Sequence, residues 1–186
     1  MPVEVKRYRQ VTNYLQTNNV QLGATYNIGK ESTRKVSQGT IAGAAYINAR
    51  TPEVVIGRST TQLFRNLSVA LKFQPGDELI LSKFGHEANI APWVSIAARS
   101  NLTVKWWTGD VDRTTSNPKF TLASLKPLLS DRTRLVTCTH ASNVLGNIHD
   151  IKALAETVHT IPGAMLCVDA VAYAPHGRLD VKALDV

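Results

Sequence analysis

The sequence predicts an α/β fold: a mostly parallel sheet flanked by helices. From about Glu53 onward, short apolar runs alternate with longer segments in which apolar residues recur at helical spacing. The short runs are almost continuously apolar, as expected for strands that are buried on both faces of a parallel sheet. A length of 186 residues fits one domain, or a large part of one, with a core of useful size.

The first 51 residues are predicted to form an N-terminal helical segment. Val3–Leu15 carries apolar residues near one helical face, and the polar stretch of residues 18–23 ends that helix. A second helix is predicted over Lys30–Asn48, although Gly39 and Gly43 weaken it. We therefore expect two helices before the first strand.

Residues 52–186 are predicted to form an α/β domain. Its predicted strands are Glu53–Ile56, Glu78–Leu81, Thr103–Trp107, Arg134–Cys138 and Ala164–Val168. The predicted helices are Thr60–Phe73, Glu87–Arg99, Leu122–Leu129 with an interruption at Pro127, and one capped by Asp150. Strands that alternate with helices form right-handed βαβ units, so these strands should lie parallel in one sheet.

The charge and composition narrow the classes of function. The net charge is +7, but the 21 Lys and Arg residues are scattered and accompany no nucleic-acid-binding motif, so no nucleic-acid partner is expected. The sequence has no signal-peptide pattern and no run of about 18 apolar residues, so we expect a cytoplasmic protein without a membrane partner. Cys138 and Cys167 lie in apolar runs and are predicted to be buried, reduced thiols. Their spacing fits no metal site.

Candidate functional residues follow the predicted strands, because ligands of open α/β sheets bind at the carboxyl ends of the strands. The segments are Arg58–Thr61, Lys83–His86, His140–Asn143 and Asp169. They supply a hydroxyl cluster, a histidine, an amide and a carboxylate. We expect all four groups to lie on one edge of the sheet.

Each candidate residue has a structural and a functional interpretation. Thr60 and Thr61 lie at a helix N-terminus, where hydroxyls either cap the helix or bind a phosphate. His86 is either a capping residue or a ring that stacks on a flat ligand or transfers a proton. Asn143 is a turn residue or a ligand contact. Asp169 is a turn carboxylate or the partner of a cationic ring nitrogen or a metal.

Three stretches carry a family resemblance. Ser82 to Trp93 reads SKFGHEANIAPW and is similar to an H-x-A-N-x-x-P-W loop, and Thr139 to Ile151 reads THASNVLGNIHDI and is similar to an H-x-S-N-V-x-G segment. Val168 to Val186, VDAVAYAPHGRLDVKALDV, resembles a V-D segment and the strand that follows it. Together, in this order, they resemble the class V aminotransferases and cysteine desulfurases, which are fold-type-I pyridoxal 5′-phosphate (PLP) enzymes. Residues 19–23 and 169–176 resemble a desulfurase-like branch found in fungal secondary metabolism.

The resemblance implies a role for each candidate residue. Thr60 and Thr61 match the pair that binds the PLP phosphate, and His86 matches the histidine that stacks on the pyridine ring and assists proton transfer. Asn143 matches an asparagine near the ring hydroxyl and the substrate carboxylate. Asp169 matches the aspartate that pairs with the pyridine nitrogen. No metal is implied.

The chain also departs from the family pattern. Ala172 stands where desulfurases usually carry a glutamine that contacts the ring oxygen, and Ser59 replaces a common glycine. The resemblance places the Schiff-base lysine beyond Val186, and Lys182 comes too early to be that residue. A glycine-rich segment that usually precedes the first helix is missing. We therefore expect an incomplete PLP-binding domain that is shortened at both ends.

The resemblance implies an enzyme that acts on an amino acid through an aldimine intermediate, by transamination or by C–S or C–N bond chemistry. It also implies a homodimeric parent protein. We expect the 186-residue chain alone to be inactive, because it has no lysine at the Schiff-base position. The alternative is a non-catalytic product that pairs with a full-length PLP enzyme.

Overall fold

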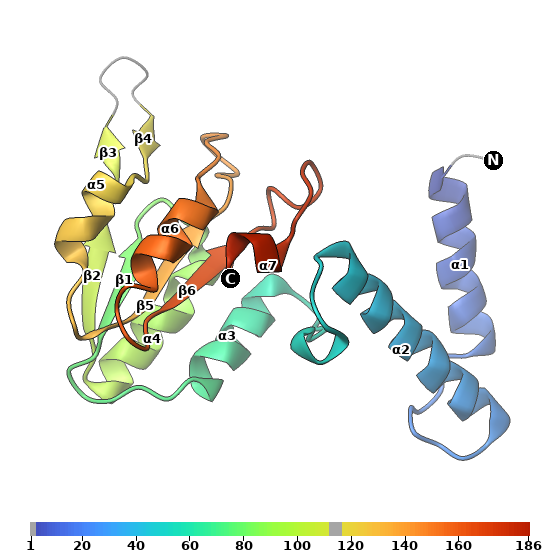
Figure 1. The fold of residues 1–186 in the computed structure, drawn as a ribbon. Helices are drawn as coiled ribbons and strands as arrows, with labels where there is room; N and C mark the ends of the chain where they lie inside the picture. The colour runs from blue at the N-terminus through green and yellow to red at the C-terminus, as the bar shows by residue number, and fades with distance from the viewer. Residues whose placement is uncertain (1–2, 112–116) are drawn as a thin grey trace. The chain divides into compact units, whose positions relative to one another are not determined.

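A computed structural model describes residues 3–111 and 117–186, and Figure 1 shows the order of its elements. The chain divides into two compact units, one that ends at Ile56 and one that runs from Gly57 to Val186. The second unit holds the sheet and the candidate residues. Each unit is described by itself.

The N-terminal unit contains two helices, as predicted. They are α1 (Val3–Thr17) and α2 (Asn27–Tyr46). Asn18 is buried directly after α1, where its backbone carbonyl accepts a hydrogen bond from Ser32 Oγ. Its side-chain oxygen accepts another from Lys35 Nζ. These bonds join the end of α1 to α2.

The predicted strand Glu53–Ile56 is wrong. The structure has a short 3₁₀ helix, η1 (Thr51–Glu53), followed by residues that pair with no strand in the described part of the chain. Pro52 is the second residue of this helix, and the Arg50 side chain pairs with Glu53. Val55 and Ile56 are 75% and 64% exposed, so this short apolar run is not buried in the sheet.

The other four predicted strands are confirmed, and they form one parallel sheet. They are β1 (Glu78–Ser82), β2 (Thr103–Trp107), β5 (Thr133–Thr139) and β6 (Met165–Asp169), in the order β2-β1-β5-β6. A small antiparallel pair, β3 (Asp110–Val111) with β4 (Pro118–Lys119), was not predicted.

The helices between the strands are close to the predicted ones. They are α3 (Thr60–Ala70), η2 (Glu87–Asn89), α4 (Ala91–Ser100), α5 (Leu122–Leu125), η3 (Lys126–Leu128) and α6 (Ile151–Val158). Asp150 caps α6, as predicted, by accepting a hydrogen bond from the Ala153 N–H. The strand expected after Asp169 is wrong: turns lead instead to the helix α7 (Val181–Leu184), which Asp180 caps.

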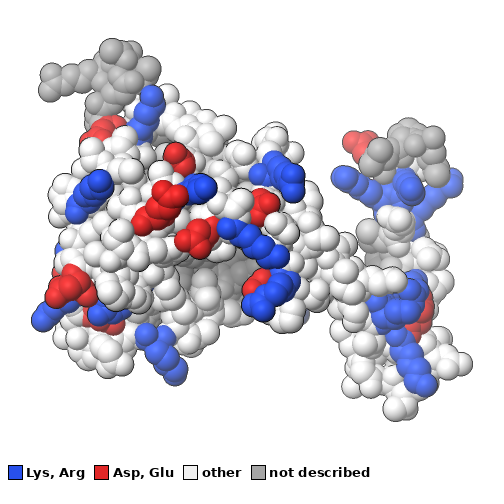
Figure 2. Space-filling view, viewed as in Figure 1, with Lys and Arg blue, Asp and Glu red and all other residues white. Residues whose placement is uncertain are grey.

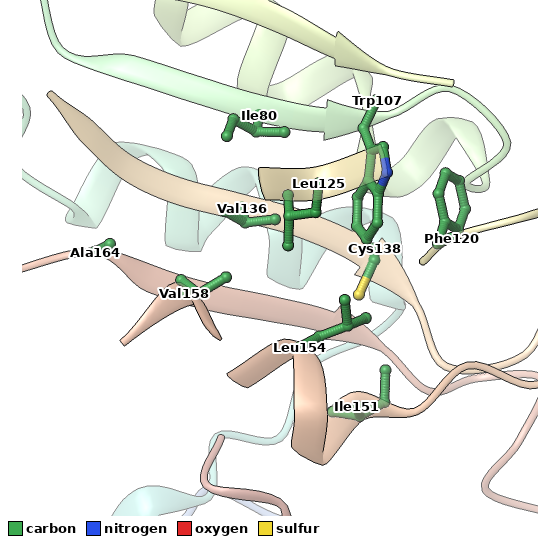
Figure 3. Packing of buried hydrophobic residues seen from close by; sticks show 10 residues of the cluster. All are labelled: Ile80, Trp107, Phe120, Leu125, Val136, Cys138, Ile151, Leu154, Val158 and Ala164. Carbon is green, nitrogen blue, oxygen red and sulfur yellow. The ribbon is translucent and has the colours of Figure 1, made fainter. Parts of the chain in front are cut away.

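Helices cover both faces of the sheet, and each face has its own core. On one face, α3 and α4 contribute Phe64, Trp93 and Ala97, which pack with Leu79, Leu81 and Leu135 of the strands. Figure 3 shows the other face, where the buried residues are Ile80, Trp107, Phe120, Leu125, Val136, Cys138, Ile151, Leu154, Val158 and Ala164. The strands alternate their side chains between these two cores. Consequently the strands that end at the carboxyl edge of the sheet are packed on both faces.

The two cysteines are free, as predicted, but only Cys138 is fully buried. Cys167 is half-buried, because it lies on β6 at the edge of the sheet. Figure 2 shows acidic and basic side chains interspersed on the visible face of the α/β unit. None of the described helices is long and apolar enough to cross a bilayer. The described residues also contain no group of three or more side chains arranged to hold a metal ion.

Candidate functional site

The strand order creates a switch point between β1 and β5. The chain passes from β1 to β2 on one side and then returns to place β5 on the other side of β1. Ligands of open α/β sheets bind at such a point, outside the carboxyl ends of the strands. A cavity of about 420 Å³ lies at this edge. All five residues predicted from the sequence line it: Thr60, Thr61, His86, Asn143 and Asp169.

Thr60 and Thr61 begin helix α3 and place two hydroxyls at its N-terminus. Ser59 caps the helix by accepting a hydrogen bond from the Gln62 N–H at 3.2 Å. Within the described residues, the side-chain hydroxyls of Thr60 and Thr61 make no hydrogen bond. Their backbone N–H groups belong to the first turn of the helix, which has no intrahelical acceptors. This end of the cavity is therefore suited to an anion.

His86 follows β1 and caps the short helix η2. Its Nδ1 accepts a hydrogen bond from the backbone N–H of Ala88 at 3.1 Å. A nitrogen that accepts a hydrogen bond carries no proton, so a neutral His86 has its proton on Nε2. The ring is exposed at the cavity. The capping and ligand-contact interpretations of His86 are thus compatible, because they use different parts of the ring.

Asp169 ends β6, and its side chain is buried at the floor of the cavity. Oδ1 accepts a hydrogen bond from the Val171 N–H at 3.0 Å, and the backbone carbonyl accepts one from the His140 N–H at 2.8 Å. Within the described residues, Oδ2 has no partner. One carboxylate oxygen therefore orients the group, and the other is available to a ligand.

Asn143 lies in a turn that Ser142 organises. Ser142 Oγ accepts hydrogen bonds from the Val144 and Leu145 N–H groups, and its backbone carbonyl accepts one from Gly146 N–H at 2.9 Å. These bonds leave the Asn143 amide without a partner in the described part of the chain, and the residue is exposed. Its side chain lies at the rim of the cavity.

Sequence reasoning gave no role to Asn89 and Trp93, although both belong to the H-x-A-N-x-x-P-W stretch. Both are buried, and the Trp93 indole N–H donates to Asn89 Oδ1 at 3.0 Å. The Asn89 amide in turn donates to the Cys138 carbonyl at 3.2 Å. The loop that carries His86 is therefore fixed to β5. The sequence motif contains both Asn89 and Trp93, but only the structure shows that Asn89 binds the Cys138 carbonyl of β5.

A second missed group includes His140, which lies between two residues that line the cavity, Thr139 and Ala141. The His140 ring stacks on Tyr173, with ring centroids 3.7 Å apart and planes 13° apart. His149 places Nδ1 2.9 Å from the Thr139 carbonyl, so that nitrogen carries the proton. Burial lowers the pKa of His140 and of His149. Two ring nitrogens, His140 Nδ1 and His149 Nε2, are buried without a partner in the described residues.

The family model for class-V aminotransferases matches residues 5–186. This chain belongs to the class-V aminotransferase family. The resemblance found in the sequence is thereby confirmed. The class-V match covers both compact units, and it includes all five residues that line the cavity.

Relatives of the class-V chain include two fungal proteins. The aminotransferase-like protein FGM3 of Gibberella zeae is 54% identical over 183 residues, which cover 98% of this chain and 44% of that protein. The cysteine desulfurase-like protein ustD of Aspergillus flavus is 48% identical over 146 residues, which cover 77% of this chain and 33% of that protein. The class-V chain thus spans less than half the length of these relatives.

The fold of the class-V chain also matches solved structures. The apo structure of a cysteine desulfurase from Thermococcus onnurineus NA1 superposes with a TM-score of 0.85 at 23% identity. The match covers 95% of this chain and 43% of that one. At this identity the likeness shows the fold alone. It confirms the predicted fold-type-I architecture of a parallel sheet with flanking helices.

Proposed function

We propose that the cavity binds PLP, and that the parent protein is a PLP-dependent class-V enzyme that acts on an amino acid. One observation carries the proposal: hydroxyls, a histidine ring, an amide and a carboxylate converge on one cavity at the switch point of the sheet. They come from four separate segments of the chain. The three motifs of the family supply three of these segments.

The residues present fit PLP. Thr60 and Thr61 would hold the phosphate with free hydroxyls and helix N–H groups. Asp169 would hold the pyridine nitrogen with Oδ2, since Oδ1 is occupied by the Val171 N–H. His86 would stack on the ring. When bound, PLP supplies an electron sink that stabilises negative charge at the α-carbon of an amino acid.

Each residue then has a defined task. The Asp169 carboxylate would keep a proton on the ring nitrogen of bound PLP, because an ionised partner favours the cationic form. His86 can move a proton only through Nε2, since Nδ1 is held by Ala88. The Asn143 amide can donate to an oxygen of the ring or of the substrate carboxylate.

The described residues that line the cavity include no lysine. We therefore propose that the 186-residue chain holds PLP without a covalent bond and has no turnover by itself. Transamination and C–S or C–N bond chemistry would both use this pocket. Dimerisation of the parent is a proposal that rests on the family resemblance. Its cytoplasmic location is a proposal that rests on the sequence pattern.

The test is a calorimetric titration of the purified chain with PLP and with 4′-deoxypyridoxine 5′-phosphate, which lacks the aldehyde. We expect one site per chain and similar affinities for the two ligands. Asp169→Asn should weaken both about tenfold, because it removes the charge that faces the ring nitrogen. Asp131→Asn, at an exposed position, should change neither.

Three results would contradict the proposal. No binding of either ligand, or equal affinities of Asp169→Asn and Asp131→Asn, would contradict the proposal that the cavity binds PLP. A much tighter complex with PLP, trapped by borohydride on one lysine, would show a covalent bond. Turnover of an amino acid by the purified chain would refute its inactivity. Specific co-purification with a full-length class-V enzyme would instead favour the non-catalytic alternative.

A further inference from the structure

A second cavity opens beside the first and shares its wall. It has a volume of about 650 Å³, compared with about 420 Å³ for the cavity proposed to bind PLP. Four residues line both: Ala141, Asn143, Val171 and Ala172. The two cavities therefore adjoin at these residues. We call the second one the side compartment.

The wall of the side compartment is apolar and contains one fixed aromatic ring. Ile148, Val171 and Pro175 contribute apolar surface, and Tyr173 contributes its ring. Tyr173 is held in place by the stack on His140, and it lies so close to Gly177 that a Cβ there would overlap the ring. An aromatic wall that is already ordered loses little entropy when it packs against a ligand.

The side compartment has almost no charge. Its described lining contains no Lys, Arg, Asp or Glu, and its ionisable side chains are Tyr173 and the exposed His176. A charged group that entered would lose hydration without gaining an ionic partner, which is unfavourable. A large apolar group would instead leave water and contact Ile148, Val171 and the Tyr173 ring.

Ala172 is one of the four residues at which the two cavities adjoin. It lines both, and its side chain is a single methyl group. A longer polar side chain at this position would extend into the space between them. The departure from the glutamine of the desulfurase pattern therefore has a physical effect, because alanine fills less of the space where the two cavities adjoin.

We propose that the side compartment receives the side chain of the amino-acid substrate, and that it selects large uncharged side chains through the space at Ala172. This inference rests on the proposed function, because it places the reacting part of the substrate in the PLP cavity. Ala172 is then a specificity-determining residue. Small and acidic amino acids are the disfavoured substrates.

The test measures binding, without any requirement for turnover. The probes are N-(5′-phosphopyridoxyl) derivatives of L-phenylalanine, L-alanine and L-aspartate, which join cofactor and amino acid through a stable amine. We expect the phenylalanine probe to bind at least about tenfold more tightly than the alanine probe, because its benzyl group leaves water. The aspartate probe should bind no more tightly than the alanine probe.

Ala172→Gln should bring the phenylalanine-to-alanine affinity ratio close to one. This ratio is taken within each variant, so a general change in affinity for the cofactor part cancels. Ala98→Gln makes the same change at an exposed position of α4 and should leave the ratio unchanged. Ile148→Ser provides a second variant at an exposed residue that lines only the side compartment, and it should lower the ratio.

The outcomes separate the two proposals. If all three probes bind equally, or if the aspartate probe binds most tightly, the side compartment does not select the side chain, while the PLP site stands. If the ratio is high but survives in both Ala172→Gln and Ile148→Ser, the selection lies elsewhere. If neither PLP nor any probe binds, the proposed function and this inference both fail.

Discussion

The side-chain amide of Asn89 donates a hydrogen bond to the backbone carbonyl of Cys138 at 3.2 Å, and so ties the loop after β1 to strand β5. Both groups are buried, and Asn89 also accepts a hydrogen bond from Trp93. His86 lies three residues before Asn89, and the turn with Asn143 follows β5 within a few residues. The bond therefore fixes the distance between two walls of the proposed cofactor site.

Asn89→Ala should destabilise the chain by about 1–3 kcal/mol, because it leaves the buried Trp93 indole N–H without its acceptor and removes a buried hydrogen bond to the Cys138 carbonyl. Urea denaturation, followed by tryptophan fluorescence, measures the free energy of unfolding. Asn66→Ala, on the exposed surface of α3, is the matched control and should change it by less than about 0.5 kcal/mol. Equal stabilities of the two variants would show that the hydrogen bond contributes nothing.

Thr61→Val should weaken binding of PLP about tenfold and leave binding of pyridoxal, which has no phosphate, unchanged. The reason is that valine keeps the shape of threonine but cannot donate a hydrogen bond to phosphate. Thr103→Val, at an exposed position of β2, is the control. Calorimetry with both ligands measures the two affinities. An equal loss of affinity for PLP and for pyridoxal would show that the substitution disturbs the fold and that Thr61 does not bind the phosphate.

Acid should destabilise the chain through His140 and His149. Burial lowers the pKa of both below the ordinary value of 6.5, so the unfolded chain binds more protons than the native chain as the pH falls. This contribution to stability is complete above pH 6.5 and is lost as the pH falls through 6.5 toward the native pKa. The slope is at most about 1.4 kcal/mol per pH unit for each histidine.

Urea denaturation between pH 8 and pH 5.5 measures this dependence. His149→Gln should lower the stability at pH 8 but flatten the slope, because glutamine does not titrate. His176→Gln, at an exposed histidine, should leave the slope as it is. A slope that is unchanged in His149→Gln would assign the pH dependence to other groups.

Both thiols should react slowly in the native chain. Burial, together with the charge of Asp169, raises the pKa of Cys167 to about 12, and burial also raises the pKa of Cys138. At pH 8 only about 0.01% of Cys167 is then thiolate, and the thiolate is the reactive form. Alkylation by iodoacetamide, followed by intact mass, should be far slower in buffer than in 6 M guanidinium. Labelling of native Cys167 at the rate of a free cysteine would contradict this.

Of the five strands predicted from apolar runs, four are present, and the absent one shows what a local pattern leaves undetermined. Glu53–Ile56 and Ala164–Val168 are both short apolar runs. Only the second finds a partner, since Leu166 pairs with Val136 of β5, whereas the first adjoins Pro52 and a 3₁₀ turn. Apolar composition predicts that a segment can be buried, but a strand also requires a neighbour, and the neighbour is set by the tertiary fold.

The residues that line the candidate site were easier to predict than the residues that position them. His86 follows β1 and Asp169 ends β6, so the rule that ligands bind at strand ends brings these two together. Thr60 lines the same cavity from the start of α3, although the strand predicted before it is absent. The stack of His140 on Tyr173 joins residues from two loops, and no residue spacing in the sequence predicts this contact. Side chains that position others depend on contacts across the fold, which periodicity does not encode.

The strand order also sets when the site can form during synthesis. β1 pairs with β2 on one side, so half of the sheet can assemble as soon as Trp107 has left the ribosome. The other side of β1 must wait for β5, and the carboxylate of Asp169 comes only with β6. A nascent chain that stalls before β6 would present the hydroxyls of α3 and the ring of His86 with no carboxylate opposite them. The synthesis of β6, which carries Asp169, therefore decides when the carboxylate first joins the hydroxyls and the ring in the cavity.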